Sequence, residues 1–341
     1  MEEDLKSQRE EKTATLRSLG LDPFPTQVDR THTAAEVVSI ISQFSDDHFG
    51  DKSTEVSVTG RIMARRAMGR ASFFDIVDGT SKIQILFRKN SLDEKLYENL
   101  NLLDLGDFIS VKGYPMKTRT GEATVEALDW KVISKSLLPL PEKFHGLKNI
   151  EVRQRQRYLD LISSDEVKTR FLLRSAITGA IRDYLKQKEY IEVETPILQP
   201  EAGGAAAKPF KTYANALAEE RYLRISLELY LKRLIIGGYE KVFEIGKIFR
   251  NEGFSNKHHP EFTMLEAYAA YTSYLDVATL VEDMISTVAK EVLGKTSIQI
   301  GNTEVSLEPP WERITLHDAL QKFGNFDLDS YKTTESLAET L

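Results

Sequence analysis

Hydrophobic and polar positions alternate through residues 54–134. Residues 83–88 read Ile-Gln-Ile-Leu-Phe-Arg, and an Asp-Gly pair stands at 78–79 before them. A period of two predicts β-strands, and Asp-Gly between two such runs favours a tight hairpin. Five short strands of this kind, with a helix at 92–100 after the third, predict a small β-barrel of the OB type.

A helical period replaces this alternation on both sides of the barrel. Residues 1–22 form a charged helical pattern that stops near Gly20, and Thr33 and Glu36 have the spacing of a capping box that opens a second helix. The pattern leaves open whether these two helices are only packing elements. Residues 166–188 predict a long helix that runs into a short strand at 191–193.

These changes of pattern divide the chain into four parts. We expect a helical extension at 1–53, a barrel at 54–135, a linker at 136–165 and an α/β-patterned domain at 166–341. The linker contains Leu-Leu-Pro-Leu-Pro, whose prolines hold the backbone extended. The fold class is therefore expected to be multidomain α+β.

Composition narrows the class of protein. The chain has no cysteine, which excludes disulfides and thiolate metal sites, and no apolar run long enough to span a membrane. Its charged start is unlike a secretory signal, so a cytoplasmic location is expected. The net charge is −7, whereas binders of phosphate backbones usually have a basic surplus, so any nucleic-acid surface must be local.

Such a local basic surface is available on the predicted barrel. Within its second strand, Phe74 and Ile76 share one face, which we expect to be the core, so Phe73 and Asp75 face outward. In the next strand, Gln84 lies on the face opposite Ile83 and Ile85, and its amide could hydrogen-bond the pairing edge of a pyrimidine. The alternative is an ordinary solvated strand with one half-buried phenylalanine. The basic residues of the region are Arg61, Arg65, Arg66, Arg70, Lys82, Arg88, Lys89, Lys112, Lys117 and Arg119.

A second group of polar residues falls on two predicted strands, 242–252 and 261–268, joined by a polar loop. Positions that differ by even steps share one face of a strand. One face of the first strand is therefore expected to carry Arg250 and Glu252, and one face of the second to carry Phe262, Glu266 and Tyr268. An arginine, carboxylates, a phenol and an aromatic ring on one surface suit a cationic, zwitterionic substrate beside a nucleotide.

Less specific interpretations of these residues remain. His258 and His259 could be an idle loop pair or a weak metal site, although no cysteine or third spaced histidine accompanies them. Arg250 and Glu252 could form an ordinary surface ion pair, which contributes little to stability.

These strings resemble the lysyl-tRNA synthetases, a family of class II aminoacyl-tRNA synthetases, over nearly the whole chain. The resemblance to motif 2 is carried by Phe-Arg-Asn-Glu at 249–252, His-Pro-Glu-Phe-Thr-Met at 259–264 and Glu-Ala-Tyr at 266–268. Residues Tyr190 to Pro196 resemble motif 1 of the family. The remaining matches are residues 60–73, Gly-Gly-Ala at 203–205, Arg-Ile-Ser-Leu-Glu at 224–228, and, at the domain junction, 143–147 and 155–161.

The resemblance implies an OB-fold anticodon-binding barrel followed by a class II catalytic domain built on an antiparallel sheet. It implies a role for each matched residue. The central uridine of the anticodon would contact Phe73, Gln84 and Glu122. ATP would contact Arg250 (α-phosphate), Glu252 (adenine amino group), His258 (outer phosphates) and Phe262 (adenine ring). Lysine would contact Arg250 (carboxylate), Glu228 and Gly204 (α-ammonium), and Glu266 and Tyr268 (side-chain ammonium). Pro196 would lie at the interface of a homodimer.

The implied reaction is ATP-dependent ligation of lysine to tRNA through a lysyl-adenylate. The lysine carboxylate attacks the α-phosphorus itself, so the protein acts by positioning and charge stabilisation, with Arg250 as the catalytic residue. Mg²⁺ is expected to bridge the phosphates. The family's glycine-rich motif 3 and acidic magnesium ligands have no match in residues 166–341, so we expect them beyond residue 341, no metal site within the chain, and an incomplete catalytic domain. A chain of this extent is expected to bind tRNA weakly without making the adenylate.

Three alternatives stay open at this point. Aspartyl- and asparaginyl-tRNA synthetases share the barrel and motifs, but two acids, Glu228 and Glu266, suit a pocket for a cation better. A ligase that attaches lysine to an elongation factor would lack the barrel. The third alternative is a non-catalytic tRNA-binding protein that retains a synthetase-like fold.

Overall fold

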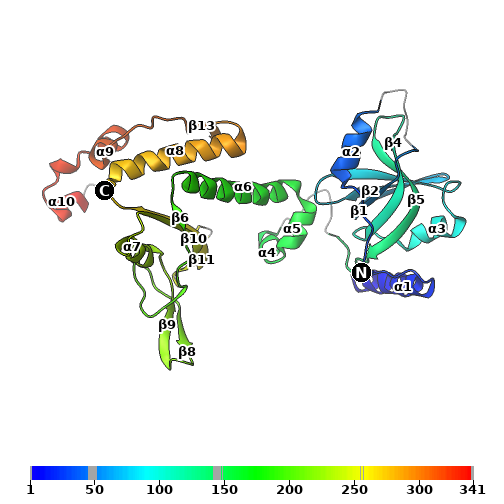
Figure 1. Ribbon diagram of the computed structural model, residues 1–341, viewed down its shortest axis with the longest axis horizontal. Helices are drawn as coiled ribbons and strands as arrows, with labels where there is room; N and C mark the ends of the chain where they lie inside the picture. The colour runs from blue at the N-terminus through cyan, green and yellow to red at the C-terminus, as the bar shows by residue number, and fades with distance from the viewer. Residues whose placement is uncertain are drawn as a thin grey trace. The chain divides into compact units, whose positions relative to one another are not determined.

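The computed structural model describes residues 2–44, 52–140, 147, 149–253, 255 and 257–338. The chain forms two compact units, Met1–Asp165 and Glu166–Leu341, here called the N-terminal and C-terminal units (Figure 1). Residues 143–146 of the resemblance at the domain junction lie outside the described residues.

The N-terminal unit is built on a closed five-stranded barrel with the strand order β1-β2-β3-β5-β4 (Figure 1). Strands β3 and β5 pair in parallel and the other neighbours are antiparallel. A short helix and a 3-10 turn stand between β3 and β4. The five-stranded barrel predicted from the alternating pattern is confirmed. Its elements are β1 (Val56–Met68), β2 (Ala71–Val77), β3 (Lys82–Arg88), α3 (Glu94–Glu98), η1 (Asn99–Leu102), β4 (Phe108–Lys117) and β5 (Ala123–Ser134).

Two N-terminal helices, α1 (Glu2–Ser18) and α2 (Ala34–Ser42), pack on this barrel. Leu16 of α1 and Val37 of α2 are fully buried in the same apolar cluster as the barrel residue Phe74. The capping box predicted at Thr33 is present, with the side chains of Thr33 and Glu36 each bonded to the other's backbone amide. The helices are therefore packing elements of the barrel, because their apolar faces complete its core.

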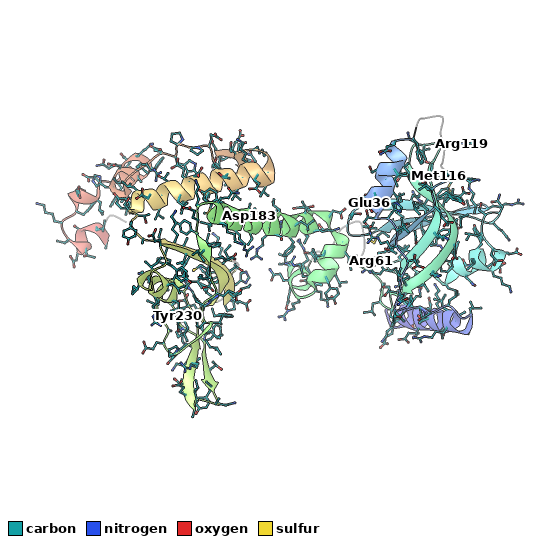
Figure 2. The ribbon with its side chains drawn as sticks, viewed as in Figure 1. Glu36, Arg61, Met116, Arg119, Asp183 and Tyr230 are labelled. Carbon is teal, nitrogen blue, oxygen red and sulfur yellow. The ribbon has the colours of Figure 1, made fainter. Side chains whose placement is uncertain are left out.

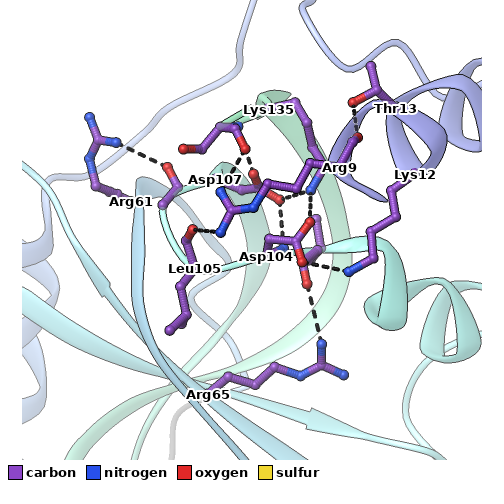
Figure 3. A network of polar contacts seen from close by, with 12 residues as sticks. Arg9, Lys12, Thr13, Arg61, Arg65, Asp104, Leu105, Asp107 and Lys135 are labelled. Atoms are coloured by element: carbon purple, nitrogen blue, oxygen red, sulfur yellow. Dashed lines mark hydrogen bonds and ion pairs between the residues drawn. The ribbon is translucent and has the colours of Figure 1, made fainter. Parts of the chain in front are cut away.

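A buried ion network holds α1 against the end of β5 (Figure 3). The side chain of Lys135 is fully buried, and its Nζ lies 2.6 Å from a carboxylate oxygen of Asp104 and 2.5 Å from one of Asp107. From α1, Arg9 donates to the carbonyl oxygens of Ser136 (2.7 Å) and Leu138 (2.9 Å). A lysine buried in this way is tolerated because two carboxylates neutralise it.

The C-terminal unit is organised around a mixed sheet with the order β11-β10-β6. The long strands β10 (Lys241–Phe249) and β11 (Glu261–Ala269) are antiparallel, and β6 (Ile191–Glu192) is parallel to β10. Phe243, at an odd position, packs with α6 (Asp165–Gln187) and α8 (Tyr274–Leu293). Val242 and Ile248, at even positions, pack with α7 (Glu228–Ile236). Helices thus cover the odd face, and the even face receives α7 and the polar residues described below.

The other elements complete the two units. No described helix is long and apolar enough to cross a membrane. A three-stranded sheet of order β7-β9-β8 lies in the C-terminal unit. The remaining bounds are α4 (Ile150–Arg155), α5 (Arg157–Ser163), β7 (Leu198–Gln199), β8 (Lys211–Ala214), β9 (Glu219–Leu223), β12 (Ser297–Ile300), β13 (Thr303–Ser306), α9 (Leu316–Gly324), η2 (Leu328–Ser330) and α10 (Thr334–Ala338).

Candidate functional site

The even-numbered face of β10 and β11 gathers most of the polar residues singled out in the sequence. In the antiparallel register, Phe262 lies opposite Ile248, Glu266 opposite Glu244, and Tyr268 opposite Val242. Opposed side chains in such a ladder project to the same side of the sheet. The prediction that Phe262, Glu266 and Tyr268 share one face is therefore confirmed.

The prediction that Arg250 and Glu252 share a face of the first strand is wrong, since β10 ends at Phe249. Beyond the strand, the Arg250 amide still donates to the Pro260 carbonyl oxygen (2.9 Å). The chain then turns toward residue 208, where the Asn251 amide donates to the Lys208 carbonyl oxygen (2.7 Å). The Glu252 carboxylate accepts from the Lys208 amide at 3.4 Å and is exposed.

Arg250 nevertheless reaches the same face as Phe262. Its guanidinium carbon lies 5.4 Å from the centroid of the Phe262 ring, within the range of a cation–π contact. Its Nε donates to the carbonyl oxygen of Ile225 at 3.4 Å. An aromatic plate and a guanidinium side by side can receive a nucleobase and an anionic group of one ligand.

Glu266 on this face is oriented by three hydrogen-bond donors. Its Oε1 accepts from the Ser226 hydroxyl (2.8 Å) and the Leu227 amide (3.1 Å), and its Oε2 accepts from the Tyr268 hydroxyl (3.0 Å). Burial raises the pKa of Tyr268, and the negative charges of Glu266 and Glu228 raise it further. The phenol therefore stays protonated as a donor across the physiological range. No lysine or arginine of the described chain forms an ion pair with Glu266.

Gly204 and Glu228 lie together beside Ser226. Gly204 has a φ of +85°, and a Cβ placed on it would come within 3.0 Å of the Ser226 hydroxyl and 3.1 Å of the Glu228 Cβ. Glycine is thus required both by the backbone conformation and by the close approach. The Glu228 carboxylate pairs with Lys232 at 2.6 Å, one helical turn further along α7.

Beneath these groups lies a buried ion pair that the sequence analysis did not assign. Arg224 and Glu244 are only 2% and 4% exposed, and Arg224 Nη1 lies 2.5 Å from Glu244 Oε1. The same guanidinium donates to the carbonyl oxygens of Thr195 (3.0 Å) and Lys247 (2.8 Å). The signal available in the sequence was the acid Glu244 on the same strand face as the apolar Val242 and Ile248. Its partner could not be identified from spacing alone.

His258 lies in the loop between β10 and β11, where it is exposed. Its Nδ1 is 2.8 Å from the Ser255 hydroxyl, and its amide also bonds that hydroxyl. No hydrogen bond or ion pair between described residues joins His258 to Arg250. The structure therefore places His258 in the same loop as the predicted nucleotide residues without bringing it onto the sheet face.

On the barrel, Phe73 of β2 is half-buried and lies opposite Arg66 of β1. Phe74 and Ile76 are fully buried, so the predicted division of β2 into an inner and an outer face is confirmed. Gln84 is not freely presented, because it is only 7% exposed and its Oε1 accepts from the Thr124 hydroxyl (3.1 Å). The neighbouring strand β5 covers it.

Some of the basic residues counted on the barrel serve its own structure. The Arg61 guanidinium carbon lies 4.2 Å from the Phe108 ring centroid, and Arg61 donates to the Gly106 carbonyl oxygen (3.1 Å). Figure 2 labels Arg61 and Arg119 on the barrel. Glu122 pairs with Lys82 at 3.3 Å, and both side chains are exposed. Of the three predicted anticodon contacts, Phe73 is half-buried and Glu122 is exposed, whereas Gln84 is buried.

Two further features bear on partners and metals. Pro196 is exposed, and the side chains of Ile197 and Leu198 beside it are 44% and 55% exposed. Within the part of the chain that the structure describes, one group could hold a metal ion, formed by His317, Asp327 and Asp329. It lies on α9, η2 and the residue before η2, not on the face of β10 and β11.

Comparisons with known proteins agree with this arrangement. Residues 149–338 match the family model described as tRNA synthetases class II (D, K and N), and residues 56–133 match the OB-fold nucleic acid binding domain. A lysine–tRNA ligase of Dehalococcoides mccartyi is 48% identical over 337 residues, which are 99% of this chain and 68% of the relative. Those of Bacillus cereus and Clostridium tetani are each 46% identical, over 97% and 98% of this chain and 66% of each relative. The chain spans about two thirds of the length of these relatives.

Proposed function

The chain belongs to the lysine–tRNA ligases among the class II tRNA synthetases, and from this premise we propose how its residues serve the ligation of lysine to tRNA. The even-numbered face of β10 and β11 binds lysine and ATP, and the barrel binds the anticodon. The family model also covers enzymes for aspartate and asparagine. Those specificities are not favoured, because the similar curated relatives are lysine ligases and the site carries two acids.

The side-chain ammonium of lysine binds Glu266 and Tyr268. The observation that carries this proposal is that Glu266 has three hydrogen-bond donors but no basic partner among the residues described. A half-buried carboxylate held by neutral donors keeps its negative charge available to a cationic ligand. The ammonium supplies the charge that the protein does not.

The α-ammonium of lysine binds Glu228 and the backbone at Gly204. When lysine binds, the Glu228 carboxylate gives up its ion pair with Lys232 and binds the α-ammonium instead. Losing this ion pair costs little free energy, because the Lys232 side chain is exposed. The Cβ-free surface of Gly204 lets the ligand approach the backbone closely. A zwitterion is thereby held at both of its ammonium groups.

ATP binds on the other half of the face. Phe262 stacks on adenine, Arg250 holds the α-phosphate and the lysine carboxylate, Glu252 accepts from the adenine amino group, and His258 contacts the outer phosphates from the loop. The lysine carboxylate attacks the α-phosphorus, the bond to the bridging oxygen breaks, and pyrophosphate leaves. The guanidinium of Arg250 can bond both reacting anions at once, so it supplies positioning and charge stabilisation.

Magnesium would neutralise the phosphates of the bound ATP. The described residues do not fit such an ion on the site face, because the group with suitable ligands stands at residues 317, 327 and 329. The proposed steps therefore rest on the protein's own side chains.

The barrel binds the anticodon of the tRNA through Phe73, Gln84 and Glu122. Phe73 is half-buried beside Arg66 and can stack on an unpaired base. Because the Gln84 amide is largely covered, it would read a base only at its exposed edge, with its carbonyl oxygen held by Thr124.

The proposed setting is the cytoplasm, with a homodimer formed through α6 and Pro196.

Pyrophosphate exchange, run separately with each amino acid on a full-length protein that contains these residues, tests the activity. Lysine should support exchange, and aspartate, asparagine and arginine should not. Calorimetric titration of the 341-residue chain with the same amino acids tests the site without requiring turnover. Preference for aspartate or asparagine in either assay would contradict the proposal.

A further inference from the structure

The hydroxyl of Ser226 is hydrogen-bonded to Glu266 and to Glu228, two of the residues proposed to bind an ammonium group of lysine. It donates to Glu266 Oε1 (2.8 Å) and accepts from the Glu228 amide (3.1 Å). It also lies 3.0 Å from where a Cβ on Gly204 would stand. The direction of both hydrogen bonds is fixed, since an amide N–H can only donate and a hydroxyl has a single proton to give.

We propose that Ser226 is a positioning residue that sets the selectivity for lysine by fixing the spacing between its two ammonium sites. This inference rests on the proposed function, because it takes Glu228 and Glu266 as those sites. Glu228 follows Ser226 by two residues, and Glu266 comes from β11, so only a bridging group can hold the two at a constant separation. Ser226 is 5% exposed, and its hydroxyl bonds both residues, while the Leu227 amide is a second contact between this segment and Glu266.

The segment that carries Ser226 is fastened to the sheet on both sides. Upstream, the Arg224 amide donates to the Ile197 carbonyl oxygen (2.9 Å), and the Phe249 amide donates to the Arg224 carbonyl oxygen (2.9 Å). The Arg224 side chain is anchored by Glu244. Downstream, α7 begins at Glu228, and Leu227 is fully buried in the cluster beneath it.

Because this segment is bonded to the sheet on both sides, the separation of the two ammonium sites is fixed. It therefore selects ligands by the length of their side chain. A ligand that is one methylene shorter than lysine, such as ornithine, cannot reach both carboxylates without moving one of them. Without the Ser226 hydroxyl, Glu266 keeps the Leu227 amide (3.1 Å) on Oε1 and the Tyr268 hydroxyl (3.0 Å) on Oε2, but it loses the shortest of its three hydrogen bonds and is held less firmly. A preorganised site should then become an adjustable one, and discrimination by length should fall.

Calorimetric titration with lysine, ornithine and ATP tests this proposal on the full chain and on Ser226→Ala. Lysine affinity should fall about tenfold, as expected for one hydrogen bond to a charged group. Ornithine affinity should change less, so that the lysine-to-ornithine ratio falls, and ATP affinity should stay within about twofold, a change of under 0.5 kcal/mol. Ser286→Ala on α8, which removes another buried serine hydroxyl of the same unit, is the matched control and should leave all three affinities unchanged.

An unchanged lysine-to-ornithine ratio in Ser226→Ala, or an equal loss of ATP affinity, would overturn the proposal. Should this variant fail to fold, Ser226→Thr keeps the hydroxyl and should retain the ratio, and a folded Thr variant that loses the ratio would count against it equally. The wild-type titration separates the two levels of inference. Absence of lysine binding there contradicts the proposed function itself, whereas normal lysine binding that Glu266→Gln abolishes and Ser226→Ala does not alter contradicts only the role of Ser226.

Discussion

Glu244 and Glu266 lie directly opposite each other across β10 and β11, and each carboxylate has its own set of partners. Like charges in this position normally destabilise a sheet. Arg224 neutralises Glu244 in a buried ion pair, whereas Glu266 is held by two hydroxyls and an amide. One acid is thereby paired within the protein, and the other has no basic partner among the described residues.

Replacing Glu266 by glutamine tests the lysine site. The side chain keeps its size but loses the charge that faces the ammonium, and removing a partner of a buried charge costs roughly 3 kcal/mol, or about 100-fold in affinity. Calorimetry should show that loss for lysine and little change for ATP. Glu291→Gln, an exposed acid at the end of α8, is the control. Equal losses for lysine and ATP would mean that Glu266 only supports the fold.

Gly246→Ala should destabilise the C-terminal unit. A Cβ there would lie 2.3 Å from Arg224 Nη2 and 3.0 Å from Glu244 Oε1, so the buried pair must separate. Breaking such a pair costs about 3–5 kcal/mol. Denaturant unfolding of Gly253→Ala, where no atom lies within 4 Å of the added Cβ, gives the comparison. Matching midpoints for the two variants would show that Arg224 can move at no cost.

Phe73→Ala should weaken binding of the tRNA anticodon stem-loop. Stacking of a base on an aromatic ring contributes about 1–3 kcal/mol, so fluorescence anisotropy should report a loss of about 5- to 150-fold. Phe24→Ala removes another phenylalanine of the N-terminal unit, one that is 41% exposed and lies outside the strands, and should have no such effect. If both variants bind alike, the stacking surface lies elsewhere.

Asp78 should make the stability of the N-terminal unit depend on acid pH. Burial alone would raise the pKa of Asp78, but hydrogen bonds from the Ala34 amide, Thr80 and the Ser81 amide lower it to about 2, from 3.8. Because the folded state has the lower pKa, the contribution is complete above pH 4 and is lost as the pH falls toward 2. It amounts to about 2 kcal/mol.

Unfolding of Asp78→Asn, followed between pH 7 and pH 2, measures this contribution. The variant should be less stable than wild type by about 2 kcal/mol at pH 7, and the difference should shrink below pH 4. Asp22→Asn, which removes an acid from the exposed segment after α1, is the control. A difference that stays constant down to pH 2 would assign the loss to packing instead of charge.

The proposed homodimer predicts a concentration-dependent mass. Ile197 and Leu198 beside Pro196 are exposed, and symmetric pairing would bury them. Light scattering at high micromolar concentration should detect dimers, and Leu198→Asp should reduce them, while Leu217→Asp, at another exposed leucine, should not. A strict monomer at these concentrations would exclude this surface as the interface.

The chain by itself determined the elements and the faces of the strands. The division of β2 between Phe73 and Phe74, the capping box at Thr33, and the common face of Phe262, Glu266 and Tyr268 all follow from local periods and local hydrogen bonds. Motifs in the printed sequence also identified the family. These features are readable because side-chain direction repeats every two residues along a strand, whatever surrounds it.

Only the tertiary structure decided which groups meet and which are covered. It ends β10 before Arg250, places Thr124 over Gln84, joins Arg224 to Glu244 and sets Ser226 between Glu228 and Glu266. The three contacts join residues of different strands or of a loop. The alternation of side chains along one strand therefore does not predict them. Periodicity predicts the direction of a side chain. Its partner depends on which other segment packs against it, and that packing is the one with the lowest free energy for the whole unit.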